Sequence, residues 1–110
     1  MKIRIYLLSA LMAFGVISTA QAVNLAAAKQ KAMFVCSECH GLQGISVVEN
    51  FPNLAGQKEL YLANQLKAFK SGVRKSQEMN LIAKQLSSAD IANLAAYFAR
   101  LPRDPKLEYR

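Results

Sequence analysis

The sequence predicts an all-α fold of about four helices in a single domain. Three observations predict it. Apolar residues recur at helical spacing in two separate segments, capping residues stand where helices would begin, and no segment alternates apolar with polar residues as a strand would. With 110 residues, the chain has room for one domain and no more.

The first helix is expected to be capped by Asn24 or one of its neighbours and to run to about Cys36. The residues between are rich in Ala, Lys, Gln and Met and include neither Gly nor Pro. From His40 to Gln57 the composition changes to Gly, Ser, Asn and Pro, which is typical of a loop. Loops of this length in so small a domain are usually functional.

A second helix is predicted over about Lys58–Ser71, ending at Gly72, because glycine is the residue favoured just after a helix. The stretch 72–78 is polar and charged, so it is expected to be a loop. A short helix from about Asn80 to Gln85 should follow.

The last helix is predicted to begin at Ser87, because Ser87 and Asp90 have the spacing of a capping box. An apolar stripe then continues to Leu101, and Pro102 ends the helix. The tail, residues 102–110, is polar, contains Pro105 and is expected to be poorly ordered.

Residues 1–22 are predicted to be a cleaved secretory signal peptide. Lys2 and Arg4 supply a basic start, an uncharged apolar stretch follows, and Ala20-Gln21-Ala22 forms an A-x-A cleavage site. An uncleaved membrane anchor would need about 18 continuous apolar residues, and Ser18 interrupts the run too early. The expected organisation is therefore a signal peptide at 1–22, one folded domain at 23–101 and the tail at 102–110.

Export predicts a periplasmic protein with no stable membrane insertion after cleavage. Removal of the signal peptide leaves 88 residues, for which a hydrophobic core alone is marginal and a bound cofactor commonly helps. Twelve basic residues then face seven acidic ones, a charge of +5, which suits partners with acidic surfaces. No aromatic residues are interleaved with a long basic run, so nucleic acid is not an expected partner.

The motif Cys36-Ser37-Glu38-Cys39-His40 is the C-x-x-C-H pattern of covalent haem attachment. Two thiols three positions apart can add to the two vinyl groups of one porphyrin, and the adjacent histidine then lies beneath the iron. The motif predicts one haem c, with Cys36 and Cys39 as attachment residues and His40 as an iron ligand.

Three other interpretations of the motif are less favoured. A simple disulfide between Cys36 and Cys39 fits an oxidising compartment but leaves His40 without a role. A thioredoxin-like pair needs a βαβ framework, which this sequence lacks. A structural zinc site needs four ligands, and the whole chain has only two Cys and one His.

The single histidine removes a second histidine as the sixth iron ligand. Methionine is the usual alternative in small electron-transfer cytochromes, where it raises the reduction potential. Met1 and Met12 leave with the signal peptide, and Met33 precedes the motif by one helical turn on the attachment side. Met79 is therefore the candidate ligand, although filling an irregular gap in the core is the other common role of methionine.

The mature sequence resembles the class I cytochrome c family, in particular the small bacterial periplasmic c553, c4 and c5 types. The resemblance rests on an ordered series of motifs: C-S-E-C-H-G-L-Q-G-I-S from Cys36, P-N-L-A-G-Q from Pro52, Y-L-x-x-Q-L-x-x-F-x-x-G from Tyr61, M-x-x-x-A-x-x-L from Met79 and D-I-A-N-L-A-A-Y-F-A from Asp90. It implies the class I cytochrome c fold, with the helices wrapped around one covalently attached haem.

The resemblance also implies roles for individual residues. They are thioether bonds at Cys36 and Cys39, axial iron ligation by His40 and Met79, orientation of the His40 ring by the backbone at Pro52, and a haem pocket lined by Leu54, Tyr61, Gln65 and Leu66. The first and last helices should cross, with Phe34 and Tyr97 near the contact. Many relatives place a glycine at this crossing, and Ala28 or Ala32 would be the small residue here.

The expected function is one-electron transfer between redox partners, and the protein is expected to be a carrier and not an enzyme. Five basic residues could form a ring that docks acidic partners or could equally be an ordinary solvated face: Lys58, Lys67, Lys70, Arg74 and Lys75. Two alternatives stay open: a haem enzyme or gas-binding sensor with an open distal site, and a fixed electron-entry subunit of a larger oxidoreductase complex.

Overall fold

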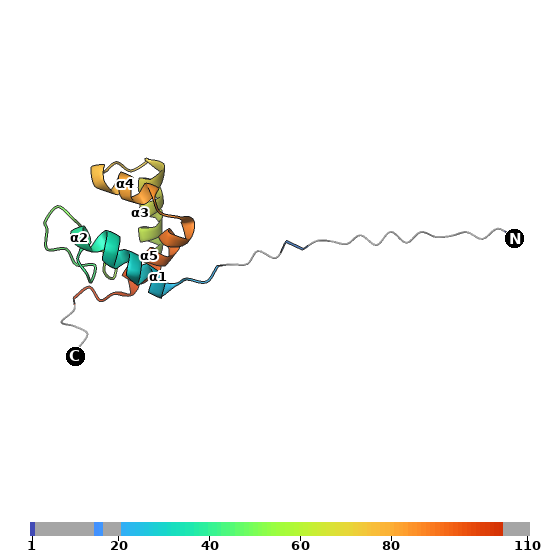
Figure 1. The fold of residues 1–110 in the computed structure, drawn as a ribbon, viewed down its shortest axis with the longest axis horizontal. Helices are drawn as coiled ribbons and strands as arrows, with labels where there is room; N and C mark the ends of the chain where they lie inside the picture. Colours follow the sequence, from blue (N-terminus) through green and yellow to red (C-terminus); the bar gives the residue numbers. More distant parts are fainter. Residues whose placement is uncertain (2–14, 17–20, 105–110) are drawn as a thin grey trace.

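The computed structural model describes residue 1, residues 15–16 and residues 21–104, and within these ranges every regular element is a helix. The elements follow in the order α1 (Leu25–Lys31), the π-helical turn η1 (Ala32–Cys36), α2 (Ser37–His40), α3 (Glu59–Ser71), α4 (Gln77–Lys84) and α5 (Ser88–Arg100). Figure 1 shows the loop after α2 at one edge of the helical part of the molecule and α4 at another, with α5 below α4. The predicted all-α class is confirmed for these residues.

The first three elements form one continuous helical stretch. Asn24 caps it as predicted, because the Asn24 side chain accepts a hydrogen bond from the Ala27 N–H at 3.0 Å. The predicted end near Cys36 was wrong, since the stretch continues through the motif to His40. Gly41, with φ +82°, then ends it.

The second and last helices match the prediction closely. α3 ends at Ser71, and Gly72 adopts the left-handed conformation with φ +81°. α5 begins with the predicted capping box: Ser87 Oγ accepts from the Asp90 N–H at 3.0 Å, and the Asp90 carboxylate accepts from the Ser87 N–H at 2.9 Å.

The predicted start of the short helix was wrong by three residues. α4 begins at Gln77 and not at Asn80, because Ser76 caps it and accepts from the Met79 N–H at 3.2 Å. Its first turn is polar, which made the sequence resemble a loop. As a consequence, Met79 lies in the first turn of a helix and not in a loop before one.

The core lies where α1 and α3 pack against α5. Ala28 and Ala32 are both buried in it, which confirms them as the small residues at the crossing of the first and last helices. Tyr97 packs against the same core, but the expected contact of Phe34 was wrong, since its side chain is 81% exposed. Phe34 follows Ala32 by two positions and therefore points to a different side of the helix.

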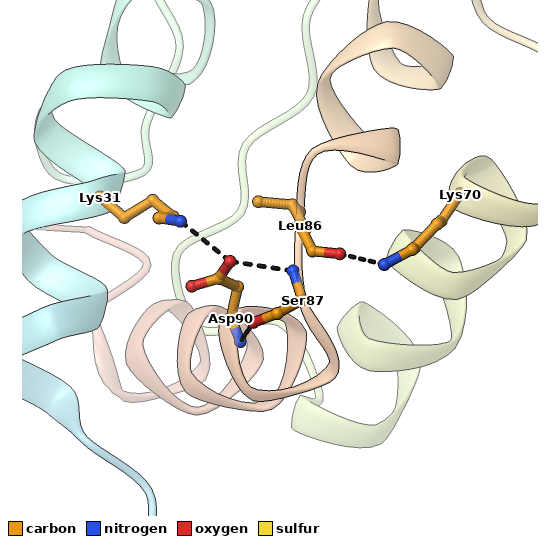
Figure 2. Close-up of polar contacts among 5 residues, drawn as sticks. All are labelled: Lys31, Lys70, Leu86, Ser87 and Asp90. Carbon is orange, nitrogen blue, oxygen red and sulfur yellow. Dashed lines mark hydrogen bonds and ion pairs between the residues drawn. The ribbon is translucent and has the colours of Figure 1, made fainter.

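Two polar contacts join the helices around the junction between α4 and α5 (Figure 2). The Lys31 ammonium lies 2.9 Å from the Asp90 carboxylate, which links the end of α1 to the start of α5. The Lys70 ammonium donates to the backbone carbonyl of Leu86, which links α3 to the same junction. Both α1, which leads into the motif, and α3 are therefore attached at the junction between α4 and α5.

Nearly all of the predicted signal peptide, residues 2–14 and 17–20, lies outside the described residues, as does the tail from 105 to 110. Among the residues that are described, no helix is both long and apolar enough to cross a membrane.

Candidate functional site

The C-x-x-C-H motif occupies the end of the continuous helical stretch, where Cys36 closes the π-helical turn and Cys39 and His40 form the last residues of α2. Both thiols are unpaired and partly buried. Burial raises the pKa of the Cys36 thiol to about 11, against an opposing effect of the nearby Lys31 ammonium. Cys36 is therefore a neutral thiol at physiological pH.

Backbone geometry in front of the motif is unusual and was not anticipated. The Ser37 N–H donates to Ala32 O, five residues back, and so does not serve Met33 O, its partner in a regular α-helix. The Ser37 hydroxyl donates to Met33 O instead, at 2.6 Å. The Ser37 side chain, which lies between the two cysteines, thus takes the place of the backbone N–H that would bind the Met33 carbonyl in a regular α-helix.

His40 is buried, with 7% of its surface exposed, and its Nδ1 lies 2.8 Å from the backbone oxygen of Pro52. A carbonyl oxygen can only accept, so the hydrogen of the neutral imidazole is on Nδ1. The lone pair is then on Nε2, the atom that can bind a metal. A second-shell carbonyl of this kind is what a ligating histidine needs for its orientation and tautomer.

The loop from 41 to 57 holds Pro52 in place through its own backbone. Gly44 O accepts from the N–H groups of Leu54 and Ala55, at 2.7 and 3.0 Å, and the Gly56 N–H donates to Phe98 O of α5 at 2.9 Å. The loop is therefore folded on itself and attached to the core, as its predicted functional role requires.

Three residues near His40 were missed by sequence reasoning. The Phe51 ring meets the His40 ring edge-on, with centroids 6.3 Å apart. Ser46 Oγ lies 2.9 Å from Cys39 O, and the Asn53 side chain accepts from the Ser46 N–H at 2.7 Å. Ser and Asn in a loop do indicate turn-forming hydrogen bonds, but their partners cannot be read from the sequence.

The four expected pocket residues lie on the loop and on α3. Leu54 and Leu66 are partly buried and pack against the core. Tyr61 is 47% exposed, and the Gln65 side chain accepts from Arg74 at 2.6 Å. Leu54 on the loop and Leu66 on α3 thus supply apolar surface, and the hydrogen-bonded pair of Gln65 and Arg74 begins at the residue next to Leu66.

Met79 is partly buried in the first turn of α4. Its backbone is fixed by the Ser76 cap, and the neighbouring α3 and α4 pack against each other. The site residues therefore come from four parts of the chain: the motif helix, the loop that carries Pro52, α3 and α4.

The donors fit a haem group. The chain offers two free thiols three positions apart, an imidazole whose Nε2 carries the lone pair and a thioether on a separate element. This set is the one required for covalent attachment and axial iron ligation in a c-type haem protein.

Comparison with known proteins identifies the family. Residues 25–102 match the family model described as cytochrome c. Cytochrome c4 of Pseudomonas aeruginosa is 45% identical over 93 residues, which are 84% of this chain and 46% of the relative. Cytochrome c-554(548) of Halomonas halodenitrificans is 39% identical over 77 residues, which are 67% of this chain and 93% of the relative. Both relatives are cytochromes by name.

Comparison with solved structures also finds a cytochrome c4. The reduced recombinant cytochrome c4 from Pseudomonas stutzeri superposes with a TM-score of 0.68 and 39% identity, over 74% of this chain and 47% of that chain. The chain thus spans about half the length of the cytochrome c4 relatives it matches. The predicted class I cytochrome c fold is confirmed.

The match over most of the chain, together with the free thiols and the oriented imidazole, gives one conclusion: this chain belongs to the cytochrome c family, and its cofactor is a covalently attached haem c with its iron.

Proposed function

We propose that this chain is an exported c-type cytochrome with a single haem that carries single electrons between redox proteins in the periplasm. The observation that carries the proposal is the hydrogen bond from His40 Nδ1 to Pro52 O at the end of the only C-x-x-C-H motif in the sequence. It leaves Nε2 available to iron and keeps the ring in one orientation. The electron-transfer relatives support a carrier over an enzyme.

In this proposal each site residue has a defined role. The Cys36 and Cys39 thiols would hold the haem through thioether bonds to its vinyl groups, and His40 and Met79 would be the iron ligands. When bound, the haem supplies one-electron chemistry, because its iron is stable in both the ferrous and the ferric state.

The apolar residues of the pocket tune that chemistry. Leu54 and Leu66 exclude water and so disfavour the additional positive charge of ferric iron, while the Met79 thioether favours ferrous iron. Tyr61 and Gln65 border the same region with polar groups. Together they favour a higher reduction potential than an exposed haem would have.

Export and the periplasmic location remain part of the proposal. Support comes from the basic start, apolar stretch and A-x-A site of residues 1–22, with cleavage after Ala22. Covalent haem on an exported chain would also explain why two cysteines three positions apart stay unpaired.

The proposed partners are redox proteins with acidic docking surfaces. Two of the five basic residues expected to dock them have other partners: Lys70 binds Leu86 O, while Arg74 binds Gln65 and lies 4.6 Å over the Phe69 ring. Lys58, Lys67 and Lys75 are exposed and are the better candidates. Their charge would raise the rate of association at low ionic strength.

The optical spectrum of the purified holoprotein tests the proposal. The ferric protein should show the far-red charge-transfer band of methionine-ligated iron, and the Met79→Ala variant should lose it. A parent protein with a high-spin spectrum that responds to carbon monoxide would contradict Met79 ligation and favour a sensor or enzyme with an open distal site. A Met33→Leu variant is the control and should keep the band, because Met33 lies on the attachment side.

A further inference from the structure

The side chain of Asn80 makes an unusual set of contacts beside Met79. Its Nδ2 donates to two backbone carbonyls, Phe69 O and Arg74 O, each at 2.8 Å, and its Oδ1 accepts from the Ser76 N–H at 2.8 Å. Two of the partners can only accept and the third can only donate, so the orientation of the amide is fixed by its surroundings. All three partners are backbone groups from outside α4.

These three contacts connect the elements on both sides of the loop that leads to Met79. Phe69 lies in the last turns of α3, Arg74 lies in the loop, and Ser76 is the residue that caps α4. A backbone bond from the Arg74 N–H to Ala68 O, at 3.1 Å, reinforces the same attachment. A single side chain therefore fixes the start of α4 to the end of α3.

α4 depends on such contacts for its position. It has eight residues, and isolated helices of that length are not stable in water. Met79 directly precedes Asn80, so the contacts that hold Asn80 also decide where the Met79 backbone lies.

We propose that Asn80 is a positioning residue for Met79: its amide holds the first turn of α4 against α3, so that the thioether of Met79 stays available as the sixth ligand. The inference rests on the proposed function, because it takes Met79 as that ligand. Aspartate cannot replace Asn80, since a carboxylate has no donor and would face two carbonyl oxygens.

The test compares holoproteins carrying Asn80→Asp and Asn64→Asp by titrating exogenous imidazole against the far-red band of the ferric protein. Asn64 is exposed on α3 and undergoes the same chemical change with the same gain of charge. Losing the two donated hydrogen bonds should let imidazole displace Met79 at least about tenfold more readily in Asn80→Asp. Asn64→Asp should titrate like the parent.

A second measurement separates positioning from general stability. The helical circular dichroism of each variant is followed with temperature, and the titration is made well below the start of unfolding. If Asn80→Asp titrates like Asn64→Asp under those conditions, the inference is overturned. If Asn80→Asp does not accumulate, Asn80→Ala and Asn64→Ala decide it by the same comparison without added charge.

The outcome is distinct from failure of the proposed function. A parent protein without the far-red band, or one that keeps it in Met79→Ala, contradicts ligation by Met79 itself. A parent with the band, its loss in Met79→Ala and unchanged imidazole binding in the Asn80 variants contradict only the role of Asn80.

Discussion

The segment that carries His40 and the segment that carries Met79 are held by different means. The histidine segment, residues 36–56, is fixed by many contacts: the bond from His40 to Pro52 O, two bonds to Gly44 O and the bond from Gly56 to α5. The methionine segment, residues 72–80, is held by the Ser76 cap, by the three contacts of Asn80 and by the contacts of Arg74 with α3. The first segment is attached mainly through the backbone of a folded loop, and the second is attached mainly through three side chains.

This difference suggests that the two segments have different roles. A ligand that stays bound through both oxidation states and through haem attachment benefits from a rigid setting, which the histidine segment has. A thioether is a weaker and softer ligand, and small changes in how its segment is held can alter its occupancy of the sixth position. Substitutions in the first segment should therefore affect formation of the holoprotein, and substitutions in the second should affect its spectrum.

The largest effect separates the two proposed iron ligands. His40→Ala should prevent stable holoprotein from accumulating, because the motif loses the iron ligand that we propose beside the attachment site. Met79→Ala should still accumulate holoprotein with covalently bound haem, but with an altered spectrum. Haem staining of denatured protein, relative to total protein, measures both. Normal haem incorporation in His40→Ala would remove the distinction between the two segments.

Two glycines compare the backbone of the two segments. Gly41 and Gly72 have almost the same φ, +82° and +81°, but ψ is 154° at Gly41 and 4° at Gly72. Gly72 therefore lies in the left-handed region, where alanine costs about 1 kcal/mol, whereas Gly41 lies in a region open essentially to glycine alone, where alanine costs more. Their surroundings differ, because a Cβ on Gly41 would lie 2.0 Å from Ile45 O, whereas a Cβ on Gly72 would meet only Lys75 Nζ at 3.6 Å.

Gly41→Ala should therefore lower the free energy of unfolding by about 2–4 kcal/mol in total, since overpacking adds to the strain. Gly72→Ala should lower it by only about 1 kcal/mol. Denaturant unfolding of the two holoproteins measures both values. Equal losses would mean that the histidine loop yields as easily as the methionine loop and would contradict the comparison.

A fall in pH should weaken the contact between Lys31 and Asp90, which attaches α1 to α5. It should leave unchanged the contact between Lys70 and Leu86 O, which attaches α3. The Lys31 ammonium, and then the Ser87 N–H, hold the pKa of Asp90 below its ordinary value. A carboxylate with a lowered pKa in the folded state stabilises the protein above its unfolded pKa, and this contribution disappears as the pH falls through the folded value. The contact of Lys70 with Leu86 O involves a backbone carbonyl in place of a carboxylate (Figure 2).

Asp90→Asn should reduce stability at neutral pH by up to about 1 kcal/mol, the value of a partly exposed ion pair, because asparagine keeps an oxygen that can accept from the Ser87 N–H but loses the charge that faces Lys31. The variant and the parent should converge as the pH falls below the pKa of Asp90, because the parent then carries a neutral side chain as well. Thermal unfolding of both holoproteins from neutral to acidic pH measures this. A difference that persists unchanged in acid would show that the charge of Asp90 does not contribute.

The sequence and the structure agree where the determining interactions are local. The helix at 59–71, the Gly72 end and the Ser87 capping box each depend on residues within one or two turns, so spacing alone predicts them. The C-x-x-C-H motif is local in the same way. The early start of α4 was missed because Ser76 precedes a polar turn, and polar residues are expected in loops and in exposed helices alike.

Features that depend on packing could not be predicted in this way. The partners of Asn80 come from residues four to eleven positions earlier, and nothing in the residue type specifies them. The π-helical turn at 32–36 has an ordinary helical composition. The turn begins at Ala32, which is buried in the core, and that burial is a tertiary feature.

The smallest effect concerns that turn. Ser37→Ala removes the hydroxyl that donates to Met33 O, a loss of about 1 kcal/mol, but alanine also raises helix propensity by about 0.5 kcal/mol. Ser88→Ala in the first turn of α5 is the control, because Ser88 is exposed and makes no side-chain hydrogen bond. In denaturant unfolding, Ser37→Ala should be less stable than Ser88→Ala by about 1 kcal/mol. If the two variants are equally stable, the hydroxyl contributes nothing to the turn, and the rigidity of the histidine segment begins only at Gly41.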